Sequence, residues 1–222
     1  MYNPKRVKPE QLSSYQALAD KAWERRVCIR SSSNIYNQSL IASFIAHDGI
    51  KATEGWLKDF VKSFARPPKG GDRDQIKAVA SGICDVAVVN TYYLGAMLNS
   101  DDAKQASQAK SVALFWPNQG TGASGAHINI SGAAVTKAAP NKSNAIKLLE
   151  FLVSDESQKW YASVNHEYPV KAGVEVSETL KQWGDFRQDT LAVEKLGELN
   201  NTIIIYSCYT RCLKLVIIYK SI

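Results

Sequence analysis

The sequence lacks most of the features by which enzymes and zinc proteins are recognised. Its histidines, His47, His127 and His166, are far apart, and no G-x-S-x-G nucleophile elbow occurs. The four cysteines include no C-x-x-C pair, so a zinc site has little support. Because no nucleophile can be paired with a base, we expect a protein that is not an enzyme.

Charge of one sign is also scarce in the main part of the chain. The formal net charge is +6, but Arg211, Lys214 and Lys220 lie in a tail without acids, which leaves +3 for residues 1–201. This excess is too small to indicate a nucleic-acid partner. Cys28 and Cys84 lie in apolar runs, and we expect both to be small buried hydrophobic residues.

Long uninterrupted apolar runs are missing as well. The first residues, Met1 to Lys5, have no apolar stretch of the kind that marks a secretory signal, so as encoded the chain is expected in the cytoplasm. The apolar segment 203–219 is interrupted by Arg211 and Lys214, and a charge at the centre of a span costs roughly 2.5 to 3.5 kcal/mol. We therefore expect no stable membrane insertion.

Hydrophobic periodicity and capping residues predict short strands that alternate with helices. The predicted strands are 27–30, 84–89, 112–116 and 127–135, and the predicted helices are 34–47, 53–64, 74–81, 90–97, 141–160 and 176–199. Such alternation is typical of an α/β domain around a parallel or mixed sheet. The stripe formed by Trp56, Phe60 and Phe64 at helical spacing is predicted to belong to the core.

Tyrosines mark two junctions at which a predicted strand leads into a helix. Tyr36 follows the first strand, and Tyr92 and Tyr93 follow the second. Ligands of open α/β sheets bind at such carboxyl ends of strands, and phenolate oxygens suit a hard cation such as Fe3+. The partial positive charge of a helix N-terminus would favour loss of the phenol proton. Buried tyrosines that only pack are nevertheless common, and spacing alone leaves that alternative open.

Three segments resemble the periplasmic ferric-iron-binding proteins of ABC transporters, most closely the cyanobacterial iron-deficiency-induced type. They are Arg26–Ser39, Asn90–Gly95 and Gly125–Gly132, and the similarity extends from about residue 2 to residue 200. The resemblance implies one lobe of a periplasmic-binding-protein type II fold, with a mixed sheet flanked by helices. It further implies Fe3+ held between two lobes with Tyr36, Tyr92 and Tyr93 as ligands, a monomer, a permease partner and a periplasmic location for the intact family.

The departures from this family are the expected absence of its first lobe and of its signal peptide. We assign residues 1–26 to a connector and hinge region, 27–200 to the solute-binding lobe with a second hinge crossing, and 201–222 to a tail that matches nothing in the family. Three protein oxygens would leave an octahedral ferric ion half open to water. The fragment is therefore expected to hold only part of the metal site.

Two alternatives were weighed against iron binding. Gly120, Gly122 and Gly125 match the G-x-G-x-x-G pattern of dinucleotide-binding loops. In those loops a helix follows the glycines, whereas here a strand is predicted to follow, and no acidic residue stands about twenty residues after the glycines. The stronger alternative is a periplasmic receptor for another small solute or an anion. It would use Arg30, the serines 31–33 and a helix N-terminus, and the tyrosines would only line the cleft.

Overall fold

The structure, a computed structural model, describes residues 1–199. The predicted tail 201–222, with its apolar segment and Cys208 and Cys212, lies outside the described residues. The chain is arranged in two compact units. Unit 1 contains residues 1–89, 108–129 and the described part from Phe186 onward, and unit 2 contains residues 90–107 and 130–185.

The described chain is rich in helices and has a small sheet. Unit 1 contains η1 (Pro9–Gln11), η2 (Gln16–Ala19), η3 (Lys21–Trp23), β1 (Val27–Cys28), α1 (Ile35–Asp48), α2 (Ile50–Phe60), η4 (Val61–Ser63), α3 (Asp72–Ala80), β2 (Val86–Ala87) and α9 (Val193–Glu198). Unit 2 contains α4 (Thr91–Leu98), α6 (Lys142–Leu152), α7 (Asp155–Trp160), the π-helical turn η5 (Tyr161–Asn165) and α8 (Glu178–Lys181), while α5 (Ala103–Lys110) spans the boundary. Within residues 1–199, no helix is both long enough and apolar enough to cross a membrane.

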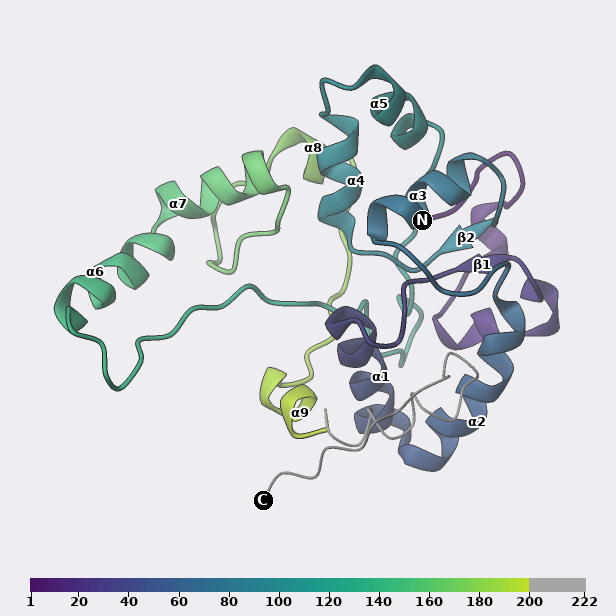
Figure 1. Cartoon of the computed structure of the whole chain (residues 1–222), viewed down its shortest axis with the longest axis horizontal. Helices are drawn as coiled ribbons and strands as arrows, with labels where there is room; N and C mark the ends of the chain where they lie inside the picture. The colour runs from purple at the N-terminus through teal and green to yellow at the C-terminus, as the bar shows by residue number, and fades with distance from the viewer. Residues whose placement is uncertain (200–222) are drawn as a thin grey trace. The chain divides into compact units, whose positions relative to one another are not determined.

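The sheet of unit 1 is a parallel pair, in which Val27 lies opposite Val86 and Cys28 opposite Ala87. Tyr2 adds antiparallel bridges to Val86 and to Ala113, so the pairing is mixed, as predicted. Figure 1 shows α3 on one side of the two strands and α1 and α2 on the other. The predicted α/β architecture is confirmed.

Two predicted strands are wrong. In 112–116 only Ala113 pairs, through its bridge to Tyr2, and in 127–135 no residue belongs to a strand. The chain next to the second segment forms one bridge, between Ala126 and Gln188. An apolar run becomes a strand only beside a strand partner, and apart from the single bridge between Ala113 and Tyr2 the described residues offer these two segments none.

The core of unit 1 is built on a chain of aromatic rings. Trp56 stacks on Phe60 with ring centroids 4.4 Å apart, and Phe60 meets the edge of Phe64 at 5.0 Å. Phe44 of α1 meets Trp56 at 4.9 Å, which joins the two helices. Burying each such ring stabilises the fold by about 1.5 to 3 kcal/mol, and the predicted core role of this stripe is confirmed.

The expected burial of Cys28 and Cys84 is confirmed, but the two form a disulfide and do not act as separate small hydrophobic residues. The bond joins the end of β1 to the turn before β2, with the Cα atoms 5.9 Å apart. The two cysteines are 56 residues apart in sequence, and only the parallel pairing of β1 and β2 brings them together. Both are almost completely buried.

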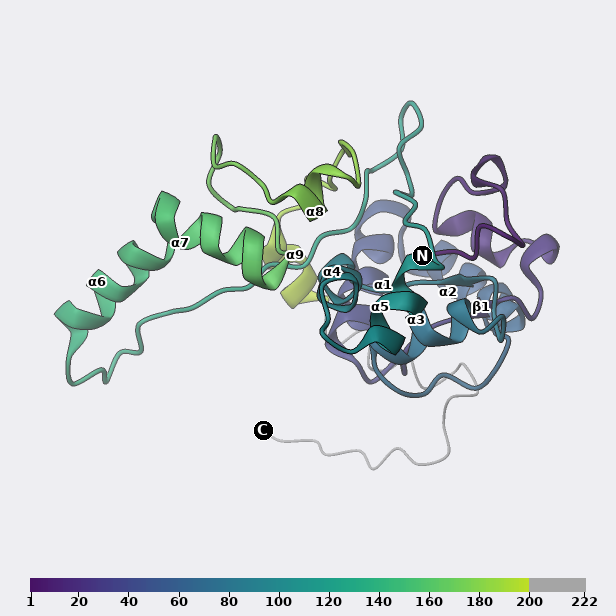
Figure 2. The same cartoon turned by 90° about the horizontal axis from the view of Figure 1, so that it is seen from above.

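Unit 2 shows where two long predicted helices break. The predicted helix 141–160 divides into α6 and α7, because Ser154 caps a new helix by accepting a hydrogen bond from the backbone N–H of Ser157. Figure 2 shows α7 following α6 directly, with a change of direction between the two helices. The predicted helix 176–199 is replaced by the short helices α8 and α9, with Gly184 in the left-handed region (φ +70°) between them.

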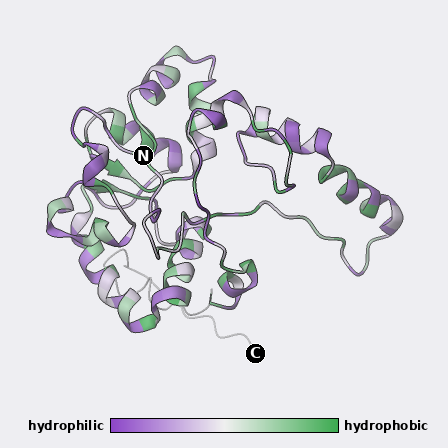
Figure 3. Cartoon of the chain, turned by 180° about the vertical axis from the view of Figure 1, so that it is seen from behind, coloured by the Kyte–Doolittle hydropathy of each residue, from purple (hydrophilic) through white to green (hydrophobic). Residues whose placement is uncertain are grey.

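Several large apolar side chains of α6 and α7 are exposed. No residue of α6 is buried, and Leu148, Phe151 and Trp160 are each more than half exposed. Figure 3 shows hydrophobic and hydrophilic residues interspersed along α6. The described residues therefore leave the apolar side of α6 without a covering element.

Gly95 in α4 allows a close approach of His166. A Cβ added at Gly95 would lie 2.5 Å from the Cβ of His166, which is buried and ends η5 in a left-handed conformation. His166 thus packs inside unit 2. The contact holds η5 against the helix that carries Tyr92 and Tyr93.

Replacing Gly95 by alanine is expected to destabilise the chain by about 1 to 2 kcal/mol. The overpacking cost of about 1 to 3 kcal/mol exceeds the gain in helix propensity of roughly 0.5 to 1 kcal/mol. The measurement is the free energy of unfolding in urea. The matched control is Gly55→Ala in α2, where no atom lies within 4 Å of the added Cβ, so this change is expected to stabilise. Equal effects of the two substitutions would contradict the prediction.

Candidate metal centre

Tyr36 is held in the first turn of α1 by the loop that follows β1. The side chain of Asn34 caps the helix by accepting a hydrogen bond from the backbone N–H of Tyr36 at 3.0 Å. Asn37 donates to the carbonyl oxygens of Arg30 at 2.7 Å and Ser31 at 3.1 Å, which folds the loop back onto the helix. The cap formed by Asn34 therefore fixes where α1 starts, and with it the position of Tyr36 in the first turn.

Arg30 lies over the ring of Tyr36. Its guanidinium carbon is 5.4 Å from the ring centroid, and its Nη1 is 2.5 Å from the carboxylate of Asp72. Asp72 is buried and stands in the first turn of α3. The charge of this arginine is thus already balanced by a neighbouring carboxylate.

Tyr92 and Tyr93 occupy the first turn of α4 in unit 2. Their ring centroids are 4.4 Å apart with an angle of 33° between the rings, and both side chains are partly exposed. They follow β2 after only a few residues, as the sequence predicted. The structure places Tyr36 in unit 1 and the tandem pair in unit 2, so their meeting at one ion stays a prediction.

The glycine-rich loop around Gly120, Gly122 and Gly125 encloses a cation of the protein itself. Nη2 of Arg187 donates to the carbonyl oxygens of Asn118, Gly120 and Ala123 at 3.1, 2.9 and 2.7 Å. A phosphate cradle needs backbone N–H groups directed inward, whereas this loop directs carbonyl oxygens at a guanidinium. Its role is structural.

A cluster of polar side chains surrounds His127 in unit 1. Nε2 of His127 is 2.9 Å from the hydroxyl of Ser39, and its backbone N–H donates to the hydroxyl of Tyr15 at 3.2 Å. Nearby, Nε2 of His47 lies 2.8 Å from buried Asp189. Desolvation lowers the pKa of His127 to about 4, although the charge of Asp189 acts in the opposite direction. At neutral pH His127 is therefore uncharged.

Acidification should destabilise unit 1 through His127. Since the pKa of this imidazole is about 4 in the folded chain and 6.5 ordinarily, only the unfolded chain binds the proton between these values. Stability is therefore lost as the pH falls from about 6.5 toward 4, by roughly 1 kcal/mol per pH unit from this group. Unfolding free energies measured across this range should depend less on pH in His127→Gln than in the wild type. An unchanged slope would show that His127 is not the responsible group.

Two features of this region were missed by the sequence analysis. The ion pair between Arg30 and Asp72 joins residues 42 positions apart. In the sequence, Asp72 after Gly70-Gly71 indicates only the start of a helix, and nothing there indicates its pairing with Arg30. The pair of His47 and Asp189 joins residues 142 positions apart and left no local signal.

The family model of the bacterial extracellular solute-binding proteins matches residues 1–188. "Iron uptake protein A1" of Synechocystis sp. is 50% identical over 197 residues, which are 89% of this chain and 54% of that protein. "Iron uptake protein A2" of the same organism is 46% identical, over 88% of this chain and 57% of that protein. The chain thus spans about half the length of the curated relatives it matches.

Solved structures of iron-uptake proteins share the fold of this chain. A Trichodesmium structure described as IdiA or FutA in complex with iron and citrate ligands superposes with a TM-score of 0.91 at 48% identity, over 96% of this chain and 66% of that chain. Apo FutA2 from Synechocystis superposes with a TM-score of 0.91 at 42% identity, over 96% of this chain and 67% of that chain. The described fold is therefore that of these iron-protein structures, over about two thirds of their length.

Proposed function

The chain belongs to the bacterial extracellular solute-binding proteins, and from this membership we propose that it binds ferric iron for an ABC-type uptake system through Tyr36, Tyr92 and Tyr93. The observation that carries the proposal is the position of the phenols. Tyr36 lies in the first turn of α1 and the tandem pair in the first turn of α4, the helices that follow β1 and β2.

The topology supports convergence of these phenols. Because β1 and β2 are parallel neighbours, the segments that leave them start from the same edge of the sheet. Each tyrosine then stands near a helix N-terminus, whose partial positive charge stabilises an oxygen anion. Three phenolates compensate the charge of one ferric ion, and hard oxygen ligands suit it. Water or a small ligand would complete an octahedral shell.

The alternative of an anion receptor is weakened by the surroundings of Arg30. An anion would have to compete with Asp72, whose carboxylate is buried and already 2.5 Å from the guanidinium. Moving Asp72 away would leave a buried charge unpaired, which costs several kcal/mol. Iron binding needs no such change, since Arg30 can remain above the ring of Tyr36.

The disulfide supports a periplasmic location. Disulfides persist in oxidising compartments and are rare in the cytoplasm. The bond between Cys28 and Cys84 is buried beside β1 and β2. We therefore propose that the chain works in the periplasm beside the permease of its uptake system, and not in the cytoplasm.

Addition of ferric citrate to the purified chain tests the proposal. A visible phenolate-to-iron charge-transfer band should develop with iron and saturate at one ion per chain. Citrate without iron, followed by calorimetry, is the control for the anion receptor. Heat from citrate alone together with no colour from ferric citrate would overturn the iron assignment.

A further inference from the structure

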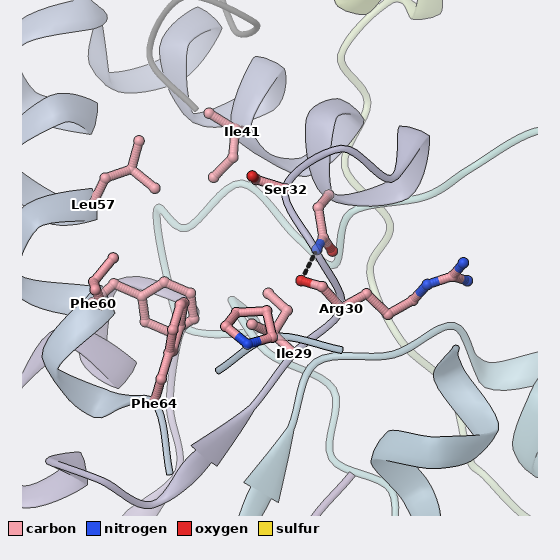
Figure 4. A pocket seen from close by; sticks show the side chains of 10 residues that line it. Ile29, Arg30, Ser32, Ile41, Leu57, Phe60 and Phe64 are labelled. Carbon is pink, nitrogen blue, oxygen red and sulfur yellow. Dashed lines mark hydrogen bonds between the residues drawn. The ribbon is translucent and has the colours of Figure 1, made fainter. Parts of the chain in front are cut away.

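Arg30 is fixed at both ends, its backbone by α1 and its side chain by α3. The side-chain amide of Asn37 donates to its carbonyl oxygen at 2.7 Å. At the other end, Nη1 lies 2.5 Å from a carboxylate oxygen of Asp72, whose side chain is only 2% exposed. Figure 4 shows the guanidinium turned away from the apolar side chains of Phe60 and Phe64. Contacts within unit 1 therefore set the position of this cation.

Asp72 is itself held by the loop that leads into α3. It is the first residue of the helix and follows the N-cap residue Gly71. The buried side-chain amide of Gln75 donates to the carbonyl oxygens of Lys69 at 2.7 Å and Gly71 at 3.0 Å, which ties this loop to the helix. The partial positive charge of the helix N-terminus stabilises the carboxylate. Asp72 is thus a well-placed anchor for Arg30.

The anchored cation lies against the face of a proposed ligand. The guanidinium carbon of Arg30 is 5.4 Å from the ring centroid of Tyr36, within the distance of about 6 Å at which a cation is attracted to an aromatic face. The cap at Asn34 fixes the backbone of Tyr36 but leaves its side-chain torsions free. The contact with Arg30 selects one orientation of the ring.

We propose that Arg30, anchored by Asp72, is a positioning residue for ferric iron, which acts through Tyr36. It holds the ring in the orientation from which the phenol oxygen reaches the ion, and its charge stabilises the electrons of the bound phenolate. The proposal rests on the proposed function, in which Tyr36 is a ligand. Residues that orient a metal ligand typically change metal affinity about 10- to 100-fold when they are replaced.

The chain offers a matched control on the same strand. The guanidinium carbon of Arg26 is 4.9 Å from the ring centroid of Trp23, and its Nε is 2.6 Å from the buried carboxylate of Asp85. This group repeats the arrangement of cation, aromatic face and buried carboxylate, but contains no proposed ligand. After Arg26→Met, Asp85 still pairs with Arg6 at 2.8 Å, so no buried charge loses its last partner.

Titration of the full chain with ferric citrate tests the proposal. The test variant is Arg30→Met/Asp72→Asn, since removing Arg30 alone would leave a buried charge unpaired and could unfold the chain. Its ferric affinity should fall about tenfold or more. At saturation its charge-transfer band should lie at longer wavelength, because the phenolate electrons lose a stabilising cation. Arg26→Met should change neither quantity. An unchanged affinity and band in the double variant, or equal changes in Arg26→Met, would overturn the proposal.

A second measurement needs no iron. In metal-free chains labelled with 3-fluorotyrosine, the fluorine NMR signal of Tyr36 can be identified by its loss in Tyr36→Phe. This signal should move in Arg30→Met/Asp72→Asn and stay in place in Arg26→Met, with circular dichroism verifying that the helices persist. A signal that stays in place in the double variant would contradict the positioning role. A wild-type chain without colour would instead refute the iron assignment, and the metal-free signal would still decide whether Arg30 orients the ring.

Discussion

Replacing Tyr92 and Tyr93 together by phenylalanine is expected to abolish the visible colour of the iron-loaded chain. The charge-transfer band requires a phenolate oxygen bound to Fe3+. Phenylalanine removes two of the three proposed phenolate oxygens while it keeps the rings, and Tyr36 alone is not expected to retain the ion. The ring contact of 4.4 Å should persist, so the fold is preserved. Loss of two anionic ligands should weaken ferric binding by at least about two orders of magnitude, or roughly 3 kcal/mol.

The control for this variant is Tyr161→Phe, which changes a partly buried tyrosine of η5 in the same unit. It should keep both the colour and the affinity. Titrations with ferric citrate, followed by absorbance, compare the three proteins directly. If the double variant keeps its colour, Tyr92 and Tyr93 are not the ligands.

Removal of the disulfide is expected to have the largest effect on stability. A bridge between residues 56 positions apart restricts the unfolded chain, and loop entropy predicts a loss of about 4 kcal/mol on its removal. The variant Cys28→Ser/Cys84→Ser should therefore unfold at a clearly lower urea concentration than the oxidised wild type. The wild type treated with dithiothreitol should behave like this variant.

The control is the double serine variant treated with dithiothreitol. Because it has no bridge to reduce, its unfolding midpoint in urea should be the same with and without the reductant. A wild-type chain that unfolds at the same urea concentration with and without reductant would contradict a stabilising bridge. Since the disulfide joins β1 to the turn before β2, its loss should also weaken the parallel pair from which the tyrosine segments start.

The positions of the candidate ligands within the fold were largely predictable because their signals are local. Asn34 marks the start of α1 through its cap, and Tyr92 and Tyr93 stand immediately after the residue that opens α4. A helix start depends on a few neighbouring residues, and these are present in the sequence. The break at Ser154 was also readable, since a serine followed by Asp155 and Glu156 is a helix-start pattern.

Long-range pairing could not be predicted in the same way. The partner of Cys28 is fixed by the register of β1 against β2, which no local pattern encodes. Segment 127–135 has the composition of a strand, but a strand also needs a neighbour, and the described chain offers it none. Whether Tyr36 meets Tyr92 and Tyr93 belongs to this long-range class, since it links unit 1 to unit 2.

The position of the bound ion tests the central claim most directly. Anomalous scattering from crystals of the iron-loaded chain would locate iron without any assumption about its ligands. The proposal predicts a single ferric ion contacted by the phenolate oxygens of Tyr36, Tyr92 and Tyr93. An ion bound elsewhere, or one that the oxygen of Tyr36 does not reach, would contradict it.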